Sequence, residues 1–195
     1  MNMRLSILDR GHAFGTKVLF ALIRTVSRQP TPEALKLIAY RPEFFGAQMK
    51  TVTHEAMRGP SAWSVGDREL MAAFVSKVNE CEYCIKAHSA VAARAYGDEA
   101  KVAAALADLD HAPIAAPLRA TLRLLAKLVR EGSVPVDDMR AILAAGVSRE
   151  QIEDALAVAF AFDVTNTLAS AFGFTVPGPK AFEAGAAFLL SRGYR

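Results

Sequence analysis

The stretch SVGDRELMAAFVSKVNECEYCIKAHSAVAARAYG, residues 64–97, decides the fold and contains the chemically informative side chains. Ser64–Asp67 has the form of a capping box, which predicts a helix from about residue 65 to 78. Asn79-Glu80 predicts a break after this helix. A second helix then carries the cysteines and ends at Gly97, a residue suited to the C′ position. The stretch therefore predicts two consecutive helices joined by a tight turn.

The two cysteines of the chain, Cys81 and Cys84, lie three residues apart in the second helix, and His88 follows four residues later. A disulfide between them would add little stability, because disulfide stabilisation in the chain-entropy model grows with loop length. On an α-helix, Cys84 lies about 60° and His88 about 20° around the axis from Cys81. All three side chains therefore share one face. The imidazole can take the Cys84 proton or support the thiolate, which is the reactive species.

Glu69, on the preceding helix, is predicted to lie behind His88. If the turn is centred on residues 79–80, the antiparallel partner of His88 lies near residue 71, about a half-turn from Glu69. We expect a hydrogen bond between Glu69 and His88, direct or through one water. Such a carboxylate would fix the tautomer of the imidazole and raise its basicity. The residues thus predict a chain from Glu69 through His88 to Cys84.

The rest of the sequence also favours helices. Alanine is heavily used, 52% of residues are hydrophobic and 22% are charged, and no long stretch alternates with period two. The fold class is therefore predicted to be all-α, with the Cys-x-x-Cys pair near the start of a core helix. We expect one domain over residues 1–195, with a core over about 31–175, an N-terminal helix within 1–30 and a tail helix within 176–195. The further helices are predicted over 12–28, 33–40, 44–57, 98–109, 117–132, 137–144, 148–162, 165–171 and 182–190.

The charge and hydropathy patterns exclude several classes of partner. The net charge is only +3 and the basic residues are spread along the chain, so we expect no nucleic-acid partner. The apolar run Val18–Ile23 is too short for a signal peptide, and Ala155–Phe162 is far short of a membrane span. We therefore expect a cytoplasmic protein with no membrane partner. In a reducing compartment, a Cys-x-x-Cys pair is redox-active or metal-binding rather than a structural disulfide.

Zinc is the chemical alternative to redox chemistry at this pair. Cys81, Cys84 and His88, with Glu69 or Glu80, would supply four ligands. Structural zinc sites usually draw their ligands from two separated pairs, however, and the chain has no second Cys/His pair. We therefore expect neither a metal nor a cofactor. Small apolar core residues are the other interpretation of the cysteines, but His88 in register with them favours a chemical role.

The pattern Glu69, eleven residues, Cys81-x-x-Cys84, three residues, His88 resembles the thiol motif of the alkylhydroperoxidase D and carboxymuconolactone decarboxylase superfamily. The resemblance extends over roughly residues 40–173. It implies a thiol peroxidase in which Cys84 is the peroxidatic thiol, oxidised to a sulfenic acid. Cys81 would then resolve this intermediate as a disulfide, while Glu69 and His88 relay protons.

The sequence departs from the best-described members at one position, where Tyr83 stands in place of a histidine before the second cysteine. Tyrosine donates a hydrogen bond well but is a poor base at neutral pH, so we expect Tyr83 to act as a hydrogen-bond donor. This change predicts a slower enzyme or a different substrate. Helix-dipole reasoning alone favours Cys81 as the more acidic thiol, whereas the i+4 imidazole of His88 and the resemblance favour Cys84.

The resemblance implies an antioxidant oxidoreductase that uses an organic hydroperoxide and a dithiol electron donor, either a lipoyl group or a thioredoxin-like protein. The amphipathic helices and the resemblance both indicate a homo-oligomer, a trimer or a hexamer. Two alternatives stay open. One is an enzyme similar to carboxymuconolactone decarboxylase, which does not need the thiol pair, and the other is a non-enzymatic, redox-sensing helical oligomer.

Overall fold

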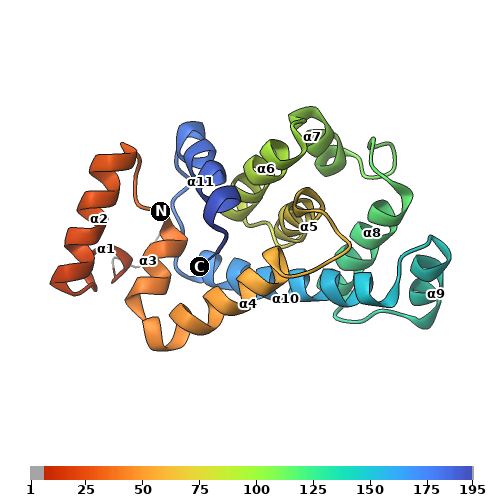
Figure 1. Cartoon of the computed structure of the whole chain (residues 1–195). Helices are drawn as coiled ribbons and strands as arrows, with labels where there is room; N and C mark the ends of the chain where they lie inside the picture. Colours follow the sequence, from red (N-terminus) through yellow and green to blue (C-terminus); the bar gives the residue numbers. More distant parts are fainter. Residues whose placement is uncertain (1–6, 195) are drawn as a thin grey trace.

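A computed structural model describes residues 7–194, and in that range every regular element is a helix (Figure 1). The predicted all-α fold class is therefore confirmed. Residues 1–6 and 195, which belong to the predicted N-terminal and tail segments, lie outside the described residues. In chain order the elements are α1 (Ile7–Arg10), α2 (Phe14–Ser27), α3 (Glu33–Tyr40), the π-helical turn η1 (Pro42–Gly46), α4 (Ala47–Arg58), α5 (Val65–Val78), α6 (Glu82–Tyr96), α7 (Glu99–Ala107), α8 (Ala116–Glu131), α9 (Val136–Ala144), α10 (Arg149–Ala171) and α11 (Pro179–Arg192).

The α5–α6 hairpin forms as the sequence predicts. The Ser64 hydroxyl accepts a hydrogen bond from the Asp67 amide, and the Asp67 carboxylate accepts one from the Ser64 amide, which completes the capping box. The turn after α5 is made by Glu80, which adopts a left-handed conformation with φ 55°. The Cys81 amide then donates to the Ser76 carbonyl over 2.9 Å, so the first cysteine is fixed to the end of the preceding helix.

Helix α5 lies at the centre of the molecule (Figure 1), and ten of its 14 residues are buried. Helices α6, α8 and α10 pack around it, and α11 packs along α6. Because α5 is enclosed on all sides, a polar side chain that points inward from it must find its partners within the protein. The core around α5 includes Met57, Leu70, Met71, Val75, Leu122, Leu125, Ile142, Val158 and Phe162.

Helix α10 corrects one prediction. The segments 148–162 and 165–171 were expected to be separate helices, but they form one helix of 23 residues. No glycine or proline interrupts it. Two polar residues near the expected break have partners in place, since the Thr165 hydroxyl donates to the Ala161 carbonyl and the Asp163 carboxylate accepts from Asn79.

Helix α2 has a different character from the central helices. It buries only Phe20, while Phe14, Val18, Leu22 and Val26 are all more than half exposed. These four residues recur every four positions and form one apolar stripe. Within residues 7–194, no helix is both long enough and apolar enough to cross a membrane.

Candidate active site

The two cysteines lie at the start of α6 and are in direct contact. Cys81 occupies the N-cap position and Cys84 lies in the first turn, with their sulfur atoms 2.7 Å apart. Both thiols are free and almost completely buried, with 5% of Cys81 and 2% of Cys84 exposed. Ala169 of α10 and Phe174, which follows α10, pack against the pair together with Tyr83. The sulfurs therefore belong to a small apolar cluster of their own, separate from the main core.

The sulfur contact makes the two thiols unequal. A hydrogen bond from Cys84 lowers the pKa of the Cys81 thiol, against the opposing effect of burial. The same contact, reinforced by burial, raises the pKa of the Cys84 thiol. The two groups titrate as one unit, so the first proton leaves the pair easily and the second is strongly retained. The first negative charge rests on Cys81, as its position at the helix N-terminus also favours.

The Glu69 carboxylate is fully buried and accepts hydrogen bonds from three other parts of the chain. It accepts from His88 Nδ1 of α6 at 2.8 Å and from Arg58 Nη2 of α4 at 2.6 Å. The hydroxyl of Tyr194, after α11, lies 2.8 Å from Oε1 and 3.1 Å from Oε2. Burial by itself raises the pKa of Glu69, but the hydrogen bonds and charges of His88 and Arg58 outweigh it and the net pKa is lowered. Glu69 is therefore ionised at neutral pH.

An ionised Glu69 determines the state of His88. A carboxylate only accepts hydrogen bonds, so His88 Nδ1 must carry a proton and, in the neutral ring, Nε2 carries the free lone pair. The ring is held by an edge contact with Phe162, with centroids 4.3 Å apart, and by stacking on Tyr194. His88 and Cys84 are separated by one turn of α6. Nε2 is therefore the ring atom that can accept a proton, and Glu69 stabilises the imidazolium; among the described residues, no hydrogen bond joins the ring to either sulfur.

Tyr83 lies beside the sulfurs, and its hydroxyl is directed to another part of the chain. Its ring makes edge contacts with Phe174 and Phe182, with centroids 5.2 and 5.8 Å apart. Its hydroxyl lies near the backbone of Glu33 and Ala34 at the start of α3, and burial raises its pKa. Among the described residues, this hydroxyl is not hydrogen-bonded to either thiol or to His88. Tyr83 therefore forms an apolar wall beside the sulfurs.

Arg58 and Tyr194 complete the site, and sequence reasoning found neither. The Arg58 guanidinium pairs with Glu69, lies 5.0 Å from the centre of the Tyr194 ring, and donates to the Leu189 carbonyl at 3.3 Å. Tyr194 is 125 residues from Glu69 in sequence. No spacing rule links Tyr194 to so distant a residue, and Arg58, 11 positions from Glu69, carried no motif that pointed to it.

The structure gives no support to the zinc alternative. Within residues 7–194, no three His, Cys, Asp or Glu side chains are grouped so that they could hold a metal ion. The carboxylate that would serve as a ligand, Glu69, is instead held by hydrogen bonds from Arg58, Tyr194 and His88.

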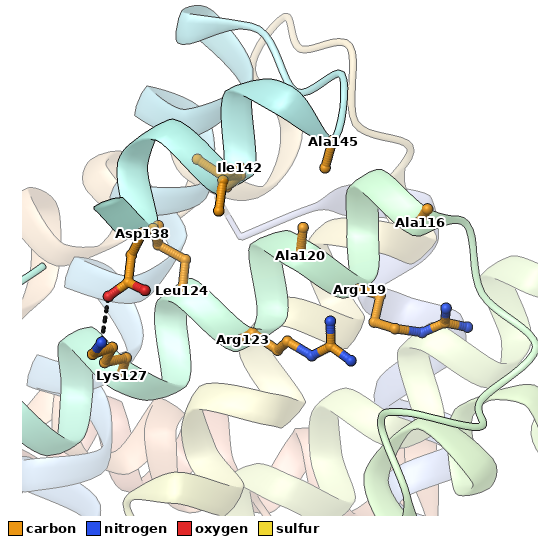
Figure 2. A pocket seen from close by; sticks show the side chains of 10 residues that line it. Ala116, Arg119, Ala120, Arg123, Leu124, Lys127, Asp138, Ile142 and Ala145 are labelled. Carbon is orange, nitrogen blue, oxygen red and sulfur yellow. Dashed lines mark ion pairs between the residues drawn. The ribbon is translucent and has the colours of Figure 1, made fainter. Parts of the chain in front are cut away.

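A cavity of about 370 Å³ lies elsewhere, between α8 and α9 (Figure 2). Its walls combine Leu124 and Ile142 with the ion pair between Lys127 and Asp138. It contains none of the residues of the thiol site. The thiols thus lie outside this open cavity, which bears on how reagents reach them.

Residues 42–127, which include Arg58, Glu69, both cysteines and His88, match the model of the carboxymuconolactone decarboxylase family. No curated protein matches the chain.

Two solved structures share the fold. One is an uncharacterized peroxidase-related protein from Silicibacter sp. TM1040, with a TM-score of 0.76 and 25% identity, covering 93% of this chain and 94% of that one. The other, described as an alkylhydroperoxidase AhpD core and an uncharacterized peroxidase-related protein, comes from Ralstonia eutropha JMP134. Its TM-score is 0.72 at 22% identity, covering 90% of this chain and 91% of that one.

Proposed function

The chain belongs to the alkylhydroperoxidase D and carboxymuconolactone decarboxylase superfamily, and from this premise we propose that it is a thiol peroxidase that reduces organic hydroperoxides. One observation carries the proposal. Two buried thiols in contact lie one helical turn from an imidazole whose tautomer is fixed by an ionised, buried carboxylate. Such an arrangement populates a thiolate at neutral pH, which is the first requirement of peroxide reduction.

The first half of the cycle oxidises Cys84. The thiol pair gives its first proton to His88 Nε2, and the remaining proton passes from Cys84 to Cys81 across the sulfur contact. The Cys84 thiolate then attacks the terminal oxygen of the hydroperoxide ROOH. The O–O bond breaks, Cys84 becomes a sulfenic acid, and the alkoxide takes the proton from the imidazolium and leaves as ROH. Glu69 holds the proton at Nδ1 throughout, so its role is to orient and stabilise the imidazolium.

The second half restores the dithiol. Cys81 attacks the sulfur of the Cys84 sulfenic acid, a disulfide forms, and the hydroxyl group leaves as water with the Cys81 proton. A dithiol donor then reduces the disulfide by thiol exchange and is itself oxidised to a disulfide. The lowered pKa of Cys81 suits its role as the resolving nucleophile.

The surroundings favour apolar oxidants. Tyr83 and Phe174 pack beside the sulfurs, and the Phe182 ring contacts Tyr83, so an alkyl or aryl hydroperoxide would meet an apolar wall. The electron donor belongs to the dithiol class, a lipoyl group or a thioredoxin-like protein. We place the enzyme in the cytoplasm, where such donors keep a Cys-x-x-Cys pair reduced, and as a homo-oligomer, a trimer or a hexamer.

The proposal is tested by single substitutions of the two cysteines. Cys84→Ser should abolish hydroperoxide-dependent oxidation of a dithiol donor. Cys81→Ser should leave a sulfenic acid that dimedone traps and mass spectrometry detects. The proposal fails if both variants consume donor at the wild-type rate.

The match to the carboxymuconolactone decarboxylase family supports a second candidate function, the decarboxylation of a carboxymuconolactone. This reaction would not need the thiols. Decarboxylase activity that survives in the Cys81→Ser, Cys84→Ser double variant would favour it. A single round of oxidation without turnover would instead favour a redox sensor.

A further inference from the structure

The reactive groups of the proposed cycle are closed off from solvent. Only 5% of Cys81, 2% of Cys84 and 6% of His88 are exposed, and Glu69 is not exposed at all. A hydroperoxide with an organic substituent cannot reach Cys84 through such a surface. Some part of the chain that covers the thiols must therefore move before each turnover.

The C-terminal segment, residues 172–194, is the part that covers them. Helix α11 packs along α6, the helix that carries Cys84 and His88 (Figure 1). Phe174, in the link from α10 to α11, packs in the sulfur cluster, and Phe182 of α11 contacts Tyr83. Helix α11 buries only Phe182 and Ala186, so its own packing area is small.

The end of this segment is fixed to the acid–base pair by polar contacts. The Tyr194 hydroxyl binds both oxygens of Glu69, and its ring stacks on His88 with an interplanar angle of 19°. The Tyr194 amide donates to His54 Nδ1 at 3.3 Å. Arg58, the ion-pair partner of Glu69, also donates to the Leu189 carbonyl. The strongest polar anchor of the C-terminal segment is therefore the buried Glu69 carboxylate.

Gly193 allows this return of the chain. Its φ is +68°, which L side chains rarely adopt, and a Cβ at this position would lie 2.8 Å from the His54 ring. Both the positive φ and the close approach of His54 thus require a glycine directly before Tyr194. This backbone conformation allows the Tyr194 hydroxyl to reach Glu69.

We propose that Tyr194 is a specificity-determining residue, whose hydrogen bond to Glu69 holds the C-terminal segment closed over the thiols and so limits the size of the reagent that reaches the Cys81–Cys84 pair. The proposal rests on the proposed peroxidase function for its biological meaning. The contacts that support the proposal and the experiment that tests it do not depend on that function. Opening requires the Tyr194–Glu69 bond to break, so weakening that bond increases the fraction of molecules that are open.

The test compares Tyr194→Phe with a matched control, Tyr96→Phe. Tyr96 also donates to a carboxylate, Asp67 at 2.6 Å, and also carries a cation over its ring, Lys101 at 3.7 Å, but it lies away from the thiols. Each variant loses one hydroxyl and keeps its ring. Thiol alkylation is measured on the reduced protein with a small maleimide and with a bulky N-aryl maleimide.

The decisive readout is the ratio of the two alkylation rates, because any change in thiol acidity affects both reagents alike. We expect Tyr194→Phe to raise the rate with the bulky maleimide by about tenfold, and to raise the bulky-to-small ratio, since a hydrogen bond to a charged group is lost. Tyr96→Phe should leave the ratio at its wild-type value. Phe182→Ala, which removes the α11 ring from Tyr83, should act in the same direction as Tyr194→Phe.

An unchanged ratio in Tyr194→Phe, or an equal rise in Tyr96→Phe, would overturn the proposal. Amide hydrogen exchange provides a second measurement, and it should become faster in α11 but not in α5. The two hypotheses fail separately. A wild-type protein without peroxide turnover removes the peroxidase, whereas an unchanged ratio removes only the role of Tyr194.

Discussion

Glu69→Gln tests whether the buried carboxylate is held as an ion. In the structure Glu69 meets only donors, namely Arg58, His88 and Tyr194. Glutamine has nearly the same shape but offers one oxygen and one NH₂ group. At least one of the three donors would then face another donor, and the Arg58 guanidinium, with a side chain only 11% exposed, would lose its counter-charge.

The expected cost follows from that lost pairing. Removing one partner of a buried ion pair destabilises a protein by about 3–5 kcal/mol, because a charge remains buried without compensation. Arg58 keeps its bond from Nη1 to the Met57 carbonyl, so we expect a loss near the lower limit, about 3 kcal/mol at pH 7.

The loss of stability in Glu69→Gln should become smaller as the pH falls. The pKa of Glu69 is lowered from its ordinary value of 4.5, so its stabilising effect is fully present above pH 4.5. That effect is lost as the pH falls through the folded-state pKa, because the carboxylate then becomes protonated in the native protein. The difference in stability between wild type and Glu69→Gln should therefore be constant from pH 8 to about 5, and should narrow below pH 4.5.

Urea unfolding at a series of pH values measures this difference directly. The control is Glu82→Gln, the same substitution in an exposed pair with Lys86, which should change stability little. If Glu69→Gln lowers the free energy of unfolding by less than about 1 kcal/mol at pH 7, the reasoning is refuted, because removing one partner of a buried ion pair should cost more than that. A difference that widens on acidification would refute the assigned charge state.

Three further outcomes are expected. His88→Asn should slow peroxide-dependent oxidation at neutral pH by about 10²–10⁴-fold, followed by stopped flow, because the base is lost; a wild-type rate would exclude His88 as the base. Val18→Glu with Leu22→Glu places charges in the exposed α2 stripe and should reduce the mass of the proposed homo-oligomer in light scattering, if that stripe is its contact; an unchanged mass would place the contact elsewhere. Ser64→Ala removes the hydroxyl that accepts from the Asp67 amide and caps α5, and it should lower the free energy of unfolding by about 1 kcal/mol. An unchanged free energy of unfolding would contradict the capping role.

Local sequence signals were sufficient for the hairpin. The capping box at Ser64 sets the start of α5, and the break at Glu80 sets the register that brings Glu69 to His88. The expected hydrogen bond is direct in the structure, at 2.8 Å. Short-range rules were enough here because the interacting residues are 19 positions apart on two adjacent helices.

Long-range features escaped those rules. Tyr194 reaches Glu69 across 125 residues, and this contact depends on how α11 returns to α6. Tyr83 was expected to act as a hydrogen-bond donor, but no periodic pattern predicts that its hydroxyl lies near the backbone at the start of α3. The continuity of α10 was missed because polar residues resemble a helix end unless their partners are known.

The contact between the two sulfurs has a consequence for thiol counting. Cys81 and Cys84 share their first ionisation, so one sulfur is reactive while its neighbour keeps a proton tightly. A native titration with a slow, limiting thiol reagent should therefore give a stoichiometry of about one per chain, although the sequence contains two cysteines. The second equivalent becomes available only after denaturation separates the pair. One reactive thiol per native chain is thus the value expected for a reduced, intact site, and it should not be taken as a sign of partial oxidation.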